Sequence, residues 1–168
     1  EKVLPWDYKK PLRKVAFSPD GKTLAVTTIG PPTETHIWDV ERWHLRASYE
    51  GASAGHSECS TDLAFAPDGK TLAVSQGTNF QPHDGAATRL FDVATGRETA
   101  TLRGDDALHL AVAFSSDGST LATASENGEI TLWDLTTLEE RMTLTWEGAN
   151  IESSEWSSFI ESMAFSPD

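Results

Sequence analysis

Cysteine and positive charge are scarce in this chain of 168 residues. The single cysteine, Cys59, cannot form an internal disulfide, so we expect a reducing, cytoplasmic location. Lysine and arginine together number 13 against 26 aspartates and glutamates, which gives a formal net charge of −13. Because phosphate backbones reward clustered lysine and arginine, this balance disfavours nucleic-acid binding. It favours a basic partner, although a solvated acidic surface explains the same charge.

Long apolar runs and catalytic motifs are missing as well. No apolar stretch approaches the ~18 residues that a membrane-spanning helix needs, and the N-terminus shows no signal-peptide pattern. The sequence contains no phosphate-binding loop, dinucleotide fingerprint or Gly-x-Ser-x-Gly motif, and its 5 histidines show no metal-ligand spacing. We therefore expect no membrane segment, no cofactor, no metal site and no enzyme activity.

One segment is instead repeated along the chain at nearly constant spacing. Residues 15–26 read VAFSPDGKTLAV, and close copies occupy residues 63–74 and 112–123, while a fourth copy opens at Met163. Four phenylalanines mark the copies at intervals of 48, 49 and 51 residues: Phe17, Phe65, Phe114 and Phe165. A period of this size indicates a repeated supersecondary unit.

Each repeat predicts four short β-strands. The first strand ends in a Ser-Pro-Asp-Gly type of segment, in which proline presets φ, aspartate bonds nearby backbone and glycine supplies a positive φ. The second strand follows directly (residues 23–27 in the first repeat), the third ends in Trp-Asp or Phe-Asp, and the fourth follows a further turn (residues 45–49, 98–102 and 141–145). Alternation and turn signals prevail over helical periodicity, so we expect an all-β fold of β-propeller blades with four antiparallel strands each.

With these residues the chain resembles the WD-repeat β-propeller family over essentially its whole length. The resemblance rests on three Asp-Gly turns in phase, on Trp-Asp at residues 38–39 and 133–134, and on Gly55-His56 ahead of the second repeat. It implies a non-catalytic scaffold or sensor that binds a protein or peptide. The positions that define the repeat are Phe17, Asp20, Trp38, Asp39, His56, Phe65, Asp68, Phe91, Asp92, Phe114, Asp117, Trp133, Asp134 and Phe165.

The resemblance also implies a buried network of His, Ser or Thr, Asp and Trp in each blade, and no repeat here has the full set. The repeat with His56 carries Phe91 and Val74 where the family has Trp and Ser or Thr. The third repeat has Thr123 and Trp133 without the Gly-His pair, and the first has its tryptophan without that pair. We expect more reliance on apolar packing, and any buried tryptophan NH to need a partner.

The repeats divide the chain into three blades at residues 15–62, 63–111 and 112–162. Residues 1–14 are predicted to hold the last strand of a preceding blade, at Lys2–Leu4, and a linker, while residues 163–168 begin the first strand of the next blade. A closed propeller needs roughly 4–8 blades, so we expect a piece of a longer propeller. The alternative is a homo-oligomer in which several copies complete one ring.

Length differences among the repeats predict where a partner binds. They fall between the second and third strands and after the fourth strand, and in an up-and-down blade both connections emerge on one face. Loops on a rigid scaffold usually carry binding, although neutral drift in loop length has the same appearance.

The insertion at residues 146–161 combines aromatic residues with glutamates and lacks lysine and arginine, which suits a basic partner. These aromatic residues can instead pack over the blade edge. The predicted binding residues are Trp146, Glu152, Glu155, Trp156 and Phe159, with Asn79, Phe80 and His83 from the second repeat.

A hydrolytic or metal-dependent propeller enzyme is the third hypothesis. Its acid–base candidates are His83-Asp84 and Asp105-Asp106, which turn formation explains better. His56 and Cys59 lie close in sequence but lack further ligands for a metal ion.

Overall fold

The computed structural model describes residues 10–30, 32–50, 62–76, 87–104, 109–125, 128–145 and 162–166. The first sheet comprises β1 (Leu12–Phe17), β2 (Thr23–Thr28), β3 (Glu34–Asp39) and β4 (His44–Glu50). The second comprises β5 (Leu63–Phe65), β6 (Thr71–Gln76), β7 (Ala87–Asp92) and β8 (Glu98–Leu102). The third comprises β9 (His109–Phe114), β10 (Thr120–Ser125), β11 (Glu129–Asp134) and β12 (Glu139–Thr145).

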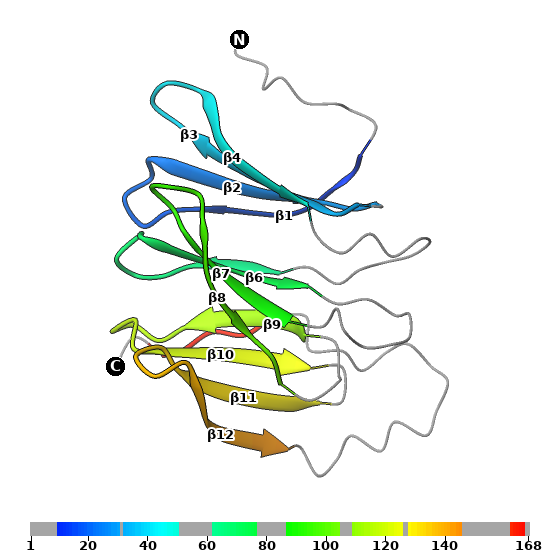
Figure 1. Cartoon of the computed structure of the whole chain (residues 1–168), viewed down its shortest axis with the longest axis vertical. Helices are drawn as coiled ribbons and strands as arrows, with labels where there is room; N and C mark the ends of the chain where they lie inside the picture. Colours follow the sequence, from blue (N-terminus) through cyan, green and yellow to red (C-terminus); the bar gives the residue numbers. More distant parts are fainter. Residues whose placement is uncertain are drawn as a thin grey trace.

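Each sheet is an antiparallel meander whose strands lie in chain order. The three sheets stack face to face (Figure 1), and among their first strands β5 contacts both β1 and β9. This is the arrangement of neighbouring β-propeller blades, so the predicted fold class is confirmed. Within the described ranges there is no helix, and hence none that could cross a membrane.

The connection between first and second strands is built the same way in all three blades. It has five residues each time (18–22, 66–70 and 115–119), and the glycine in each adopts a φ between 69° and 72°, which suits glycine best. In the first blade the Ser18 hydroxyl accepts from the Thr23 NH at 2.9 Å and donates to the Asp20 carboxylate at 2.6 Å. Ser115 makes the same bonds in the third blade, whereas Ala66 stands at this place in the second. What recurs in all three turns is the aspartate Oδ1, which accepts from the backbone NH two residues further on.

Apolar packing between neighbouring sheets forms the core. Ala25 and Ile37 of the first blade pack with Leu72, Val74 and Phe91 of the second. The opposite face of the second blade packs on the third in the same manner, and this cluster includes Ala73, Leu90, Leu102, Val112, Leu121 and Trp133. The two larger apolar clusters therefore lie between blades, and each blade supports the next.

The buried tryptophans differ in their hydrogen bonding. Trp133 Nε1 donates to Thr123 Oγ1 at 3.0 Å, which identifies the partner that its burial requires. Trp38 is 2% exposed, and its Nε1 has no hydrogen-bond partner within the described part of the chain. The residue that corresponds to Thr123 in the first blade is Val26, which packs against Trp38 but offers no acceptor.

The predicted flanking strands have a different status. Lys2–Leu4 lies outside the described residues, so the strand expected there stays a prediction. Residues 162–166, where the fourth repeat begins, carry no strand assignment.

Candidate functional site

The two edges of the blade stack differ in the connections that they carry. At one edge, here called the turn edge, the first-to-second connections have five residues each and the third-to-fourth connections span only residues 40–43, 93–97 and 135–138. At the opposite edge, the loop edge, the second-to-third connections span residues 29–33, 77–86 and 126–128. Because the strands alternate in direction, the fourth-to-first connections leave from the loop edge too. All marked length variation therefore belongs to one edge, as the sequence predicted.

The predicted binding residues come from those loop-edge connections. All of them lie outside the described residues, so their geometry stays a prediction: Trp146, Glu152, Glu155, Trp156, Phe159, Asn79, Phe80 and His83. His56 and the two acid–base pairs lie outside the described residues as well.

The described part of the loop edge contains a polar cluster around Glu34. One carboxylate oxygen pairs with Lys10 and the other lies 3.1 Å from His36 Nε2, while the Glu34 NH donates to Thr28 Oγ1 at 3.0 Å. Lys10 also donates to the Pro32 carbonyl at 3.1 Å, so the cluster spans the connection after β2. The hydrogen bond from Lys10 lowers the pKa of Glu34 below its usual value. A carboxylate held charged in this way clamps the loop and is a poor proton acceptor.

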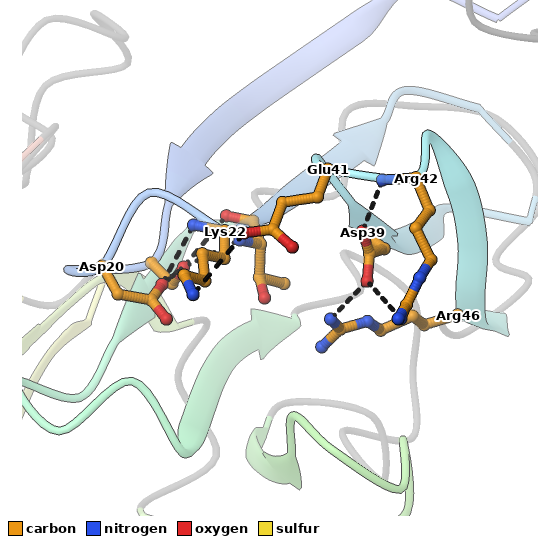
Figure 2. Close-up of polar contacts among 8 residues, drawn as sticks. Asp20, Lys22, Asp39, Glu41, Arg42 and Arg46 are labelled. Carbon is orange, nitrogen blue, oxygen red and sulfur yellow. Dashed lines mark hydrogen bonds and ion pairs between the residues drawn. The ribbon is translucent and has the colours of Figure 1, made fainter.

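The turn edge of the first blade has its own ionic cluster, shown in Figure 2. Asp39 Oδ2 accepts from Arg46 Nη2 at 2.6 Å, and Asp39 Oδ1 accepts from the backbone NH of Arg42 at 2.8 Å. These bonds, led by the one from Arg46, lower the pKa of Asp39 to about 2. Nearby, Lys22 and Glu41 form an exposed pair at 3.5 Å, which joins the two turns of this blade.

The aspartates at the equivalent place in the other blades perform the same capping. Asp92 Oδ1 accepts from the Thr95 NH at 2.7 Å, and Asp134 Oδ1 accepts from the Thr136 NH at 2.8 Å. The Trp-Asp and Phe-Asp pairs therefore serve the fold, because each aspartate closes the turn that follows its strand.

Asp62 joins all three blades and was not identified from the sequence. It lies just before β5 with an 8% exposed side chain, pairs with Lys14 Nζ of β1 at 2.8 Å, and accepts from the Val112 NH of β9 at 3.0 Å. A buried carboxylate needs such partners to be tolerated. The aspartate precedes the second repeated segment directly, and that position was the one available signal.

Tyr49 makes a second joint between the first two blades. Its ring stacks on Phe91 with the centroids 4.0 Å apart, and its hydroxyl donates to the Gly96 carbonyl. Burial raises the pKa of Tyr49 to about 12, and the Asp92 carboxylate adds to the shift. The hydroxyl therefore stays protonated at neutral pH and remains a donor.

The turn aspartates predict how stability depends on pH. Hydrogen bonds from Arg46 to Asp39 and from Ser115 to Asp117 lower both pKa values from 3.8 to about 2. Because the folded pKa lies below the unfolded one, this contribution to the free energy of unfolding is complete above pH about 4 and is lost as pH falls through about 2. Urea denaturation between pH 7 and pH 2 should show that decline.

Variants separate these two aspartates from the other carboxylates. Asp117→Asn and Asp39→Asn should each flatten the decline between about pH 4 and pH 2. Glu41→Gln removes an exposed carboxylate whose pairing with Lys22 is weak, so it should leave the decline unchanged. Equal slopes in all four proteins would contradict the assignment.

No chemistry-bearing constellation emerges from the described residues. Within these ranges, no group of three or more His, Cys, Asp or Glu side chains could hold a metal ion. The ionic clusters hold turns, loops and blades in place, so their role is to make the scaffold rigid.

Comparison with known proteins agrees with this architecture. A family profile described as "WD domain, G-beta repeat" matches residues 96–134, which span β8 to β11. The solved structure described as "Structure of U3-55K" superposes with a TM-score of 0.68 at 18% sequence identity, over 86% of this chain and 42% of that one. This chain thus spans less than half the length of that protein, and the likeness shows the fold alone. A search of curated proteins found no match.

Proposed function

We propose that this stack of β-propeller blades, which matches the WD-repeat profile over residues 96–134, is a non-catalytic scaffold that binds a protein or peptide partner through its loop edge. Propellers of this kind commonly mediate protein interactions. The observation that carries the proposal is the contrast between the two edges. The first-to-second connections keep five residues in every blade, whereas the second-to-third connections vary from residues 126–128 to residues 77–86. Turns of constant length on one side and loops of variable length on the other are typical of a scaffold that presents a binding surface.

The charge of the chain defines the partner's chemistry. A net charge of −13 attracts a basic partner and raises its association rate. The loop at residues 146–161 supplies the aromatic anchors on which binding energy usually concentrates, with glutamates around them. The Glu34 cluster fixes the first-blade part of the same edge, so part of the surface is preorganised.

Fluorescence anisotropy with labelled peptides tests this proposal. Lysine- and arginine-rich peptides that contain an aromatic residue should bind. Peptides of the same length in which Glu replaces every Lys and Arg should not. Trp156→Ala and Phe159→Ala should each weaken binding by about tenfold or more, the loss of roughly 1.4 kcal/mol of anchor energy. Trp43→Asn is the matched control, since Trp43 is an exposed aromatic on the turn edge with a positive φ that asparagine tolerates. Equal losses in all three variants, or binding that ignores peptide charge, would contradict the proposal.

Self-assembly into a ring is a second candidate, favoured by the outer faces of the end blades. Val15 and Phe17 of β1 are each 57% exposed, and Met142 and Leu144 of β12 are 52% and 49% exposed. The equivalent phenylalanines of the second and third blades, Phe65 and Phe114, are partly buried in the joints between blades. A sedimentation coefficient that falls on dilution of the peptide-free protein would support association of copies through these faces, and a constant monomer value would reject it.

A further inference from the structure

A hollow of about 430 Å³ lies between the second and third blades at the turn edge. Its aliphatic wall includes Leu90, Ala100, Leu135 and Leu138. Two exposed carboxylates line the same hollow, from Asp68 in the first turn of the second blade and Asp117 in the corresponding turn of the third. The hollow thus combines an apolar wall with negative charge from two blades.

Thr99 also lines the hollow, and comparison of the repeats shows what this position usually holds. In every blade, one residue of the fourth strand sits at a β-bulge, opposite the point where the register to the third strand shifts. That residue is Arg46 in the first blade, Thr99 in the second and Arg141 in the third. Only the second blade lacks a long cationic side chain here.

The arginine of the first blade shows how such a side chain is used at this edge. Arg46 is 30% exposed, and its guanidinium donates to Asp39 at 2.6 Å (Figure 2). Thr99 is too short to act in this way, and its hydroxyl donates to the Leu90 carbonyl at 3.1 Å. The threonine therefore leaves room for a guanidinium beside the carboxylates of Asp68 and Asp117, which pair with no arginine among the described residues.

We propose that this hollow binds an arginine side chain presented by a protein or peptide partner. The aliphatic stem would pack on Leu90, Ala100 and Leu138, and the planar guanidinium would donate to the carboxylates of Asp68 and Asp117. Arginine suits the site better than lysine because its five donors form a fixed fork that can address two carboxylates at once.

Both carboxylates keep acceptor capacity for such a ligand. Asp117 Oδ1 accepts from Ser115 Oγ at 2.6 Å and from the Ser119 NH at 3.0 Å, and Ser119 Oγ lies 2.9 Å from both carboxylate oxygens. Asp68 Oδ1 accepts from the Lys70 NH at 2.9 Å. An ionised carboxylate offers about four lone-pair sites, so each group has some left over. The bonds to Asp117 also lower its pKa to about 2, which keeps it charged at neutral pH.

The inference rests on the proposed function in one respect, namely that the partner is basic. It goes further by placing a contact on the turn edge, on the side opposite the variable loops. A partner that contacts both edges would have to reach around the blade stack, so the two sites can be tested separately.

An NMR titration of the ¹⁵N-labelled full chain tests the site. The probe is the peptide acetyl-Gly-Arg-Gly-amide, and its counterpart with citrulline is the neutral control of nearly the same shape. We expect shifts of the amides of Thr99, Gly118 and Leu138, and binding about tenfold weaker for the citrulline peptide, because charge-assisted hydrogen bonds are lost.

Thr99→Arg is the decisive variant. The new side chain would extend from a residue that lines the hollow, so it should fill part of the hollow and abolish the shifts. It should also fold, because two of the three blades already carry arginine at this position. Asp68→Asn should weaken binding by about tenfold. Asp20→Asn, the equivalent change in the first blade, should leave binding unchanged and serves as the matched control.

Several outcomes would overturn the proposal. Equal affinity for the arginine and citrulline peptides would remove its electrostatic basis, and unchanged binding to a folded Thr99→Arg protein would exclude the hollow. If the Trp156 and Phe159 variants bound longer basic peptides as well as the unchanged chain does, while the arginine-peptide titrations gave the expected results, only the loop-edge function would be contradicted. If the loop variants lost binding to the longer peptides, while Thr99→Arg left binding of the arginine peptide unchanged, only the arginine site in the hollow would be contradicted.

Discussion

Replacing Gly96 by alanine should destabilise the chain by roughly 2–4 kcal/mol. Gly96 has a φ of 70°, which an L-residue adopts only with strain. A Cβ added there would lie 2.6 Å from Ala47 Cβ and 3.0 Å from Tyr49 Oη. Neither neighbour can yield freely, because both belong to β4 and the Tyr49 ring is stacked on Phe91. The third-to-fourth turn of the second blade must therefore move away from the first blade.

Gly21→Ala is the matched control for this effect. Gly21 has a φ of 69°, but a Cβ there would meet nothing within 4 Å, so only the backbone strain of about 1 kcal/mol remains. Urea denaturation followed by circular dichroism gives the free energy of unfolding of both variants. Tyr49→Phe keeps the ring stack and removes only the hydrogen bond to Gly96, so its cost should be about 1 kcal/mol. If Gly96→Ala cost no more than Gly21→Ala, the first two blades would not meet as described.

Contacts between neighbouring blades could not be predicted from the sequence. The bond from Tyr49 to Gly96 joins residues 47 positions apart, and the bond from Val112 to Asp62 joins residues 50 positions apart. Both distances are close to one repeat length, so the two partners lie in neighbouring blades. A repeat in the sequence specifies one blade, and it does not say which atoms of adjacent blades touch.

The blade itself was predictable because its signals are local. Aspartate and glycine set each first turn, with proline before them in the first two blades, and the apolar pattern sets the strands around it. The fourth strand of the second blade, predicted over residues 98–102, is β8 at Glu98–Leu102. The strands were otherwise expected to be shorter than observed, as with β12, which begins at Glu139 and not at residue 141. Strand ends depend on cross-strand pairing, which residue types alone do not fix.

The candidate site, too, was predictable from the sequence only in part. That the long connections share one edge follows from strand order, and the structure agrees. The aromatic and acidic residues expected on them lie outside the described residues and stay predictions. The contrast among Arg46, Thr99 and Arg141 was visible in the aligned repeats, but its meaning required the hollow to be seen beside Thr99.

Removing the hydroxyl of Thr123 should cost about 1–3 kcal/mol of unfolding free energy. Thr123 is 1% exposed and accepts the Trp133 Nε1 hydrogen at 3.0 Å. Thr123→Val keeps the shape of the side chain and leaves a buried indole NH without an acceptor. The free-energy cost of removing that NH from water is then no longer offset by a hydrogen bond. Guanidinium chloride denaturation followed by circular dichroism measures the loss, and Ser in place of Thr should restore most of it.

The first blade allows the reverse change, and the second blade supplies its control. Val26→Thr places a hydroxyl at the position equivalent to Thr123, within the cluster that holds the Trp38 ring, and should stabilise the chain by about 1 kcal/mol because that indole NH gains an acceptor. Val74→Thr makes the same change at the equivalent position of the second blade, where the ring is Phe91. Phenylalanine has no donor, so burying the hydroxyl there should cost about 1–3 kcal/mol. Opposite signs from one substitution in two equivalent blades would show that the ring's NH group, and not the volume of the side chain, sets the energy. A loss of stability in both variants would contradict the absence of a partner for the Trp38 NH among the described residues.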